Sequence, residues 1–194
     1  MSGLLYSIVV PVYKSEKTLW ELSERIDKVF ASFDDDYELI LVEDCGGDSS
    51  WRIMQSIRRS NNNVKIVRLT KNFGQHNALM CGFTFATGQY VITMDDDLQN
   101  PPEEIEKLIN AIKGSDYDVV YGVPGQQRQS LIRKLSSRSY SLLNSIIFRK
   151  VSGLRISNFR IVRRSIIEQI LKINTPNPIC LLYTSDAADD EFIV

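Results

Sequence analysis

Short apolar segments alternate with segments of helical periodicity through the first 123 residues, and this alternation limits the possible folds more than any other feature. Runs rich in valine and isoleucine predict five strands, at residues 7–13, 37–43, 64–70, 90–94 and 118–123. Apolar residues spaced by three and four predict amphipathic helices between them, for example over 19–33 and 105–112. Strands that alternate with helices form a mostly parallel sheet covered on both faces. The sequence therefore predicts an α/β fold.

The chain changes character after residue 124. Residues 125–172 carry 11 basic residues against one acidic residue, whereas residues 1–124 carry 12 against 19. Apolar residues on one helical face predict a long amphipathic helix around residues 128–149, followed by a strand at 156–162 and a helix at 165–172. So basic a segment is expected to meet an anionic partner, for which phosphate groups, nucleic acid and an acidic membrane surface are candidates.

Composition and motif content exclude several classes of protein. No apolar run approaches the roughly 18 residues that a membrane-spanning helix needs. The cysteines Cys45, Cys81 and Cys180 lie far apart, which excludes a disulfide framework and suits a reducing cytosol. Dinucleotide, NTPase and hydrolase-elbow motifs are missing, and His76, the single histidine, is expected to have a structural role.

The last residues of the chain match none of these patterns. Both periodicities stop beyond Pro176 and Pro178, and the stretch from Cys180 onward resembles translated adapter sequence. We therefore expect one domain over residues 1–179 and a non-native tail over residues 180–194.

Three consecutive aspartates, Asp95, Asp96 and Asp97, directly follow the fourth predicted strand. Ligands of open α/β sheets bind beyond the carboxyl ends of the strands. Like charges are unfavourable side by side unless a cation or hydrogen-bond donors compensate them. The carboxylates of Asp95 and Asp97 can face the same way from an extended segment, and with the amide oxygen of Gln99 they supply the oxygen ligands that suit Mg²⁺ or Mn²⁺. The alternative is a solvated acidic loop that caps the next helix.

Other polar residues follow the remaining strands at the same predicted edge. Asp44 ends the second strand in a glycine-rich turn, where it could be either an Asx-turn residue or a ligand-binding residue. Tyr13 follows the first strand, and Lys71 follows the third. Polar groups from four separate segments thus converge on one edge, which purely structural loops would not require.

Four strings, in this order, resemble the family 2 glycosyltransferases of the GT-A fold, and within them the bacterial polyprenyl-phosphate glycosyltransferases and dolichol-phosphate mannose synthase-like enzymes. They are VPVY (10–13), LVEDCGGDSS (41–50), KNFGQHNA (71–78) and MDDDLQNPPEEI (94–105), of which the last is the most specific. The likeness spans residues 5–172. It implies a nucleotide-sugar- and metal-binding half over 1–123 and a basic acceptor-side half over 124–179. It also implies C-terminal truncation, because the family continues into interfacial helices and, often, membrane spans.

The resemblance also implies roles for individual residues. Asp95 and Asp97 match the D-x-D pair, and Gln99 matches the metal-proximal glutamine. Arg160 matches the arginine that contacts the diphosphate and, with Asp95 and Asp97, completes the implied catalytic set. The implied nucleotide-sugar-binding residues, among which Asp44 reads the base, are Pro11, Tyr13, Asp44, Lys71, Gly74, Asp95, Arg128, Lys134 and Arg160.

The chain departs from the family pattern at three informative positions. Lys14 stands where the family usually has asparagine, Cys45 where it has glycine, and Asn158 where many relatives have aspartate. Because Asn158 cannot accept a proton as a carboxylate would, a phosphate acceptor, which needs no strong base, is favoured over a sugar hydroxyl. Asp96 remains a candidate base for a hydroxyl acceptor.

The predicted activity is therefore an inverting transfer of a sugar from a nucleotide-diphosphate sugar to an acceptor, favoured to be a polyprenyl phosphate of cell-envelope synthesis. A sugar hydroxyl acceptor and a binding fragment without turnover are alternatives; a sugar-phosphate nucleotidyltransferase would have a glycine-rich loop after the first strand, which is missing. Nucleic acid is disfavoured because residues 125–172 have few aromatics for stacking. We expect peripheral attachment to the anionic cytoplasmic face of the membrane, while the sequence does not fix the oligomeric state.

Overall fold

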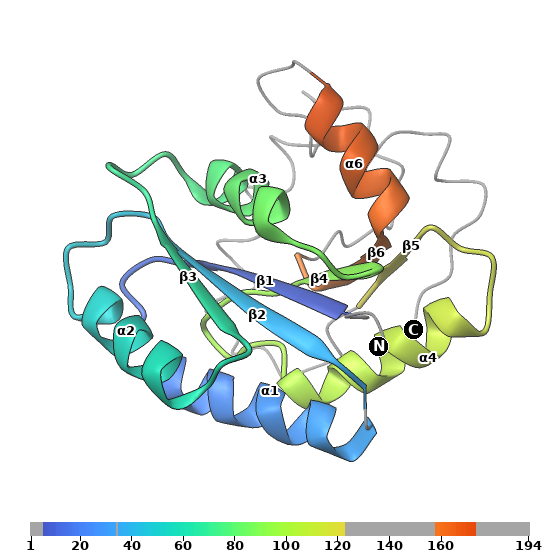
Figure 1. Cartoon of the computed structure of the whole chain (residues 1–194), viewed down its shortest axis with the longest axis horizontal. Helices are drawn as coiled ribbons and strands as arrows, with labels where there is room; N and C mark the ends of the chain where they lie inside the picture. The colour runs from blue at the N-terminus through green and yellow to red at the C-terminus, as the bar shows by residue number, and fades with distance from the viewer. Residues whose placement is uncertain (1–5, 34, 123–157, 174–194) are drawn as a thin grey trace, which may run out of the picture.

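A computed structural model describes residues 6–33, 35–122 and 158–173. Its strands form one six-stranded sheet in the order β3-β2-β1-β4-β6-β5 (Figure 1). The strands β1, β2, β3 and β4 are mutually parallel, while β6 runs antiparallel to both β4 and β5. The strand bounds are β1 Tyr6–Val12, β2 Tyr37–Glu43, β3 Val64–Arg68, β4 Tyr90–Thr93, β5 Val119–Tyr121 and β6 Arg160–Arg163.

Helices cover both faces of this sheet. In the view of Figure 1, α3 and α6 lie above the sheet, and α1, α2 and α4 lie below it. The helix bounds are α1 Leu19–Phe33, α2 Ser50–Ser60, α3 Gln75–Phe85, the 3₁₀ turn η1 Pro102–Glu104, α4 Ile105–Lys113 and α6 Arg164–Lys172. The described residues therefore form a three-layer α/β arrangement.

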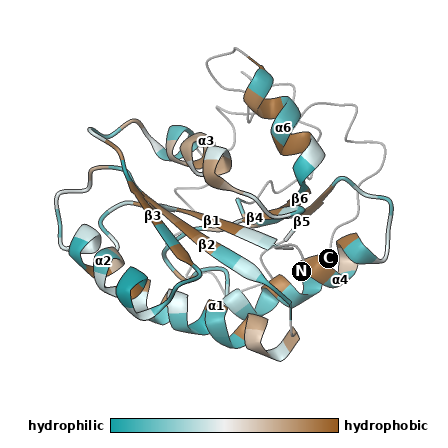
Figure 2. Cartoon of the chain, viewed as in Figure 1, coloured by the Kyte–Doolittle hydropathy of each residue, from teal (hydrophilic) through white to brown (hydrophobic). Residues whose placement is uncertain are grey.

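The sheet separates two apolar cores. Every residue of β1 is buried, and successive side chains alternate between the cores: Ile8 packs in the lower core with α1 and α4, and Val9 in the upper core with α3. Figure 2 shows the matching pattern, with apolar strands and helices that are polar on one side. Gly82 lets α3 approach β1 closely, since a Cβ there would overlap the Val9 side chain.

The first five predicted strands are confirmed, with small differences at their ends. The predicted strand at 156–162 is confirmed in part, since β6 runs from Arg160 to Arg163 and residues 156 and 157 lie outside the described residues. Register explains its position: Arg160 pairs with Thr93 and Arg163 with Tyr90, so β6 matches the four residues of β4. The predicted basic helix around 128–149 and the tail at 180–194 lie outside the described residues. Among the helices of the described part, none is long and apolar enough to cross a bilayer.

A buried carboxylate on β2 joins the amino-terminal edge of the sheet to the α3–β4 connection. Glu38 Oε1 accepts hydrogen bonds from the Ser7 hydroxyl at 2.6 Å and from the Thr87 N–H at 2.7 Å, and its other oxygen forms an ion pair with Lys65. Burial would raise the pKa of Glu38, but these donors outweigh burial and hold the pKa below its usual value of 4.5. The ionised form is thus the one that the fold stabilises.

Stability is therefore expected to fall with acidification through Glu38. A carboxylate whose pKa is lower in the folded state stabilises the fold above its unfolded pKa, and this contribution is lost as the pH falls below about 4.3. Glu38→Gln should lose about 2 kcal/mol of unfolding free energy at pH 7 and should show a shallower acid dependence than the parent protein. Urea unfolding at pH 7 and pH 4 measures both, with Glu24→Gln, on the exposed surface of α1, as the control. Equal acid slopes for Glu38→Gln and the parent would contradict the assignment.

Candidate active site

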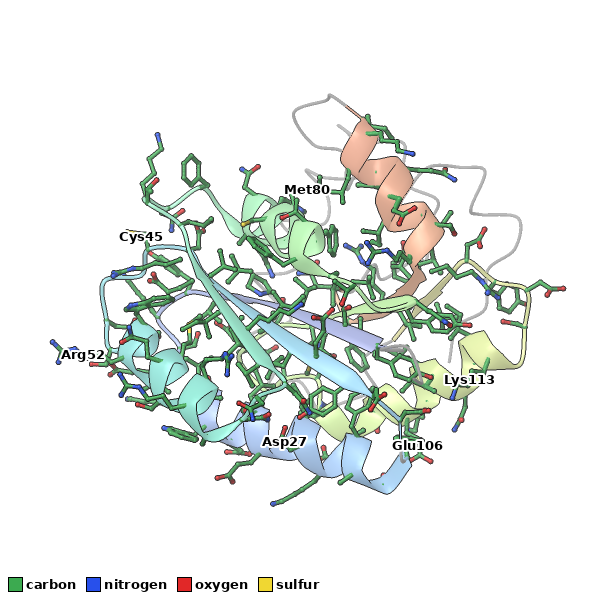
Figure 3. All side chains as sticks on the ribbon, in the orientation of Figure 1. Asp27, Cys45, Arg52, Met80, Glu106 and Lys113 are labelled. Atoms are coloured by element: carbon green, nitrogen blue, oxygen red, sulfur yellow. The ribbon has the colours of Figure 1, made fainter. Side chains whose placement is uncertain are left out.

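The predicted polar residues gather at the carboxyl edge of the parallel strands. The turns that leave β2 and β3 lie at the left of Figure 1, and Cys45, labelled in Figure 3, marks the turn after β2. The segments that follow β1 and β4 meet at this edge too, since the Tyr13 N–H donates a hydrogen bond to Asp96. The structure thus brings together the ends of strands that are far apart in sequence.

Asp95 is held by two side-chain amides. Its Oδ1 accepts from Gln75 Nε2 at 2.6 Å and from Asn158 Nδ2 at 3.3 Å. Burial, together with the charge of Asp97, raises the pKa of Asp95, whereas the two amides and the positive charge of Arg160 act against this rise. Since both amides bond to Oδ1, the second oxygen of Asp95 is the one suited to a further ligand.

Asp97 lies at the surface beyond this carboxylate. Its Oδ1 accepts the backbone N–H of Gln99 at 3.0 Å, and Leu98 between them has a φ of 59°. The left-handed turn therefore keeps Asp97 and the exposed Gln99 close to each other.

The donor set fits a hard divalent cation in chemistry, since Asp95, Asp97 and Gln99 offer carboxylate and amide oxygens. Within residues 6–33, 35–122 and 158–173, no group of three histidine, cysteine or acidic side chains is arranged to hold a metal ion by itself. Mg²⁺ sites in proteins are commonly completed by water and by oxygens of a bound phosphate.

Asp44 is buried and organises the loop that follows β3. Its Oδ1 accepts the Phe73 N–H at 2.7 Å, and its Oδ2 accepts the Gly74 N–H at 2.9 Å. Gly74 has a φ of 87°, a conformation that glycine adopts without strain, and it immediately precedes α3. Asp44 thus bonds across to the neighbouring loop, which differs from the local Asx turn considered from sequence.

The exposed side chains around Asp44 combine aromatic rings with cations. Lys14 Nζ lies 5.2 Å from the centre of the Tyr13 ring, and Lys71 Nζ lies 5.0 Å from that of Phe73. Pro11, in contrast, is buried within β1, where it pairs with Val42. Two exposed pairs of an aromatic ring and a cation, in the loops next to a buried carboxylate, suit a flat, polar, negatively charged ligand.

Arg160 is fully buried at the start of β6, opposite Thr93 at the end of β4. Its guanidinium lies 6.0 Å from the centre of the Tyr121 ring, and its charge acts against the rise in the pKa of Asp95. The register of β6 therefore places a permanent positive charge beside the aspartate cluster.

Some predicted residues stay untested and others were missed. Arg128 and Lys134 lie outside the described residues. Sequence reasoning missed Gln75 and also Glu43, a buried carboxylate that accepts the Gly46 N–H at 2.6 Å and pairs with Arg68 at 2.9 Å. The two consecutive acidic residues Glu43 and Asp44 were the available signal. Successive side chains of a strand point to opposite faces of the sheet, so two acids in a row at a strand end need separate partners.

Two of the expected departures from the family pattern fall on residues with a left-handed backbone. Lys14 and Cys45 have φ values of 57° and 54°, in the region that asparagine and glycine adopt more readily than lysine and cysteine. The asparagine and glycine that the resemblance implies at these positions would therefore suit the two turns better than the residues of this chain.

Curated proteins and a family profile are similar in sequence to this chain. The glycosyl transferase family 2 profile matches residues 7–171. Two curated relatives, both named undecaprenyl-phosphate 4-deoxy-4-formamido-L-arabinose transferase, come from Klebsiella pneumoniae subsp. pneumoniae and Proteus mirabilis. They are 38% and 39% identical over 85% and 86% of this chain, and the match covers 50% and 51% of the relatives. The chain therefore spans about half the length of these relatives.

Solved structures share the fold. The mannosyltransferase PcManGT from Pyrobaculum calidifontis, in complex with GDP-Man and Mn²⁺, gives a TM-score of 0.63 at 16% identity, covering 92% of this chain and 50% of that one. Glucosyl-3-phosphoglycerate synthase from Mycobacterium tuberculosis, in complex with Mn²⁺, UDP and its product, gives 0.60 at 18% identity, covering 84% and 58%. The predicted GT-A fold is confirmed, and with a profile match over most of its length the chain belongs to glycosyl transferase family 2.

Proposed function

We propose that this protein transfers a sugar, with inversion, from a nucleotide-diphosphate sugar to a polyprenyl phosphate in cell-envelope synthesis. The observation that carries the proposal is the placement of Asp95 and Asp97 at the carboxyl edge of the sheet with the buried charge of Arg160 beside them. The name of the curated relatives, an undecaprenyl-phosphate sugar transferase, supports the acceptor class.

In the proposed reaction, an acceptor phosphate oxygen forms a bond to the anomeric carbon as the bond from that carbon to the diphosphate oxygen breaks. Asp95, Asp97 and Gln99 would hold Mg²⁺ or Mn²⁺, which neutralises the charge that develops on the leaving diphosphate. Arg160 supplies a fixed positive charge to the same leaving group, without reorganisation during the reaction.

The nucleoside would occupy the neighbouring loops. Tyr13 offers an exposed ring for the base, and Lys71 and Gly74 would lie along the nucleotide. Asp44 would act on the base through the loop that it fixes, because both of its oxygens already accept backbone N–H groups from Phe73 and Gly74. Pro11 would shape the end of β1, and Arg128 and Lys134 would add charge near the phosphates.

A phosphate acceptor is supported by what lies near Asp95. Asn158, whose amide donates to Asp95, has no carboxylate with which to remove a proton. A phosphate is already anionic near pH 7 and needs no strong base. A sugar hydroxyl acceptor remains the second candidate, and binding without turnover the third.

The basic stretch around residues 128–149 would bring the enzyme to the anionic cytoplasmic leaflet. Each lysine or arginine near such a surface contributes about 1 kcal/mol, and the attraction is screened over about 10 Å at 0.1 M salt. We expect co-sedimentation with vesicles that contain anionic lipid, weakening steeply as salt rises. Neutral vesicles are the control, and equal binding to them would point to hydrophobic insertion instead.

A panel of UDP- and GDP-sugars, with Mn²⁺ or Mg²⁺, tests the proposed function. Thermal shift reports binding, and release of the nucleoside diphosphate in the presence of a short-chain polyprenyl phosphate reports transfer. Binding with acceptor-dependent release supports the proposal. Binding without release of nucleoside diphosphate in the presence of any acceptor favours a binding fragment without turnover. Release with a glycan acceptor but not with the lipid phosphate favours the hydroxyl acceptor.

A further inference from the structure

Asp96, the middle aspartate of the triplet, contacts the loop after β1. Its Oδ2 accepts the Tyr13 backbone N–H at 3.0 Å and also the Ser15 hydroxyl. The two donors converge on one oxygen, although Tyr13 and Asp96 are 83 residues apart in the sequence. Asp96 therefore ties the β4 loop, which carries the other two aspartates, to the β1 loop.

The β1 loop is also fixed from the α2 side. The Ser15 N–H donates to Ser50 Oγ at 2.9 Å, and the Ser50 hydroxyl in turn donates to Asp48 at 2.8 Å. Lys14, at a φ of 57°, turns the chain between the two residues that bond to Asp96. The backbone of Tyr13 is thereby held by its neighbours, while its ring stays exposed.

We propose that Asp96 is a positioning residue, which fixes Tyr13 for binding the nucleoside of the sugar donor and sets its distance from Asp95 and Asp97. This inference rests on the proposed function and gives Asp96 a role different from that of the candidate base. Its Oδ2 already accepts two hydrogen bonds from the protein, and both donors lie in the loop after β1 that is proposed to hold the nucleoside.

Because both donors bond to the same oxygen of Asp96, two substitutions can separate a positioning role from that of a base. Asp96→Asn keeps an oxygen that can accept both hydrogen bonds but cannot act as a base, whereas Asp96→Ala removes the acceptor. A positioning role predicts an affinity for nucleoside diphosphate within about threefold of the parent for Asp96→Asn and a loss of about 10-fold for Asp96→Ala. A catalytic base predicts instead that both variants lose kcat to the same extent.

A second comparison tests whether Asp96 acts through Tyr13. If it does, Tyr13→Ala weakens binding in the parent but adds little to the loss already caused by Asp96→Ala, so that the two losses are not additive. Ser15→Ala removes one of the two donors and should give an intermediate loss. A merely structural role would leave the losses from Tyr13→Ala and Asp96→Ala additive.

The experiment is calorimetry of the full chain and each variant with UDP and with GDP, in Mn²⁺, together with steady-state kinetics on the sugar donor that binds. Thermal unfolding confirms that every variant is folded. Retained binding by Asp96→Asn, weakened binding by Asp96→Ala and non-additivity with Tyr13→Ala support the inference. Parent-like binding by Asp96→Ala, equal loss of kcat in both Asp96 variants, or additivity overturns it while the proposed function stands. A parent protein that binds neither UDP nor GDP overturns the proposed function and the inference together.

Discussion

Replacing Asp97 with alanine is expected to abolish Mn²⁺-dependent binding of nucleotide sugar and to lower turnover by about 1000-fold. A cation at a phosphoryl oxygen contributes several kcal/mol to the stability of the transition state, and each 1.36 kcal/mol is about tenfold in rate. Asp97 is exposed, and its one described hydrogen bond closes a surface turn with Gln99, so the fold should survive the change. Calorimetry with and without Mn²⁺ measures the affinity for nucleotide sugar and its dependence on the metal directly.

A matched control separates the loss of a ligand from the loss of a surface charge. Asp116 is also an exposed aspartate, but it lies before β5 at the opposite edge of the sheet. Asp116→Ala should leave both the affinity and its dependence on Mn²⁺ unchanged. If Asp97→Ala kept the Mn²⁺-dependent affinity of the parent, the metal site would have to lie elsewhere.

The sheet could be predicted because parallel strands buried on both faces have nearly continuous apolar sequences. In β1 and β2 every residue is buried, and both were predicted almost to the residue. The antiparallel strand β6 was harder to delimit, because two of its four residues, Arg160 and Arg163, are basic and their place in a strand depends on pairing with β4. The full burial of Arg160 could not be predicted, because an arginine in a strand is usually at least partly exposed.

The edge that carries the candidate site was also predictable, since the carboxyl ends of parallel strands must meet. The partners within that edge were not. Three of the turns there contain a residue other than glycine with a positive φ, namely Lys14, Cys45 and Leu98. No periodicity signals such a conformation, yet it decides which oxygen faces which N–H. Two sets of hydrogen bonds depend on these turns. The Tyr13 N–H donates to Asp96, and the N–H groups of Phe73 and Gly74 donate to Asp44.

Arg160→Met is expected to reduce kcat/KM by about 100-fold to 1000-fold, which is the loss found when one fixed electrostatic donor to a developing negative charge is removed. Arg160 is fully buried beside the aspartate cluster, where water does not screen its charge. Methionine keeps much of the aliphatic volume, but removing one member of a buried charged group leaves its partners uncompensated, so thermal unfolding must first confirm that the variant is folded. In the folded variant the loss should appear in chemistry and in diphosphate binding.

Binding of UDP compared with UMP, or of GDP with GMP, isolates the role of this charge. If Arg160 contacts the diphosphate, Arg160→Met should weaken the diphosphate much more than the monophosphate, and Arg160→Lys should recover part of the difference. Arg163→Met is the matched control, because Arg163 lies on the same strand but bonds to the carbonyls of Tyr117 and Ser115 at the opposite edge. A kcat/KM of Arg160→Met close to that of the parent would instead assign Arg160 to the packing of β6 beside Tyr121, and the charge that stabilises the diphosphate would have to come from another residue.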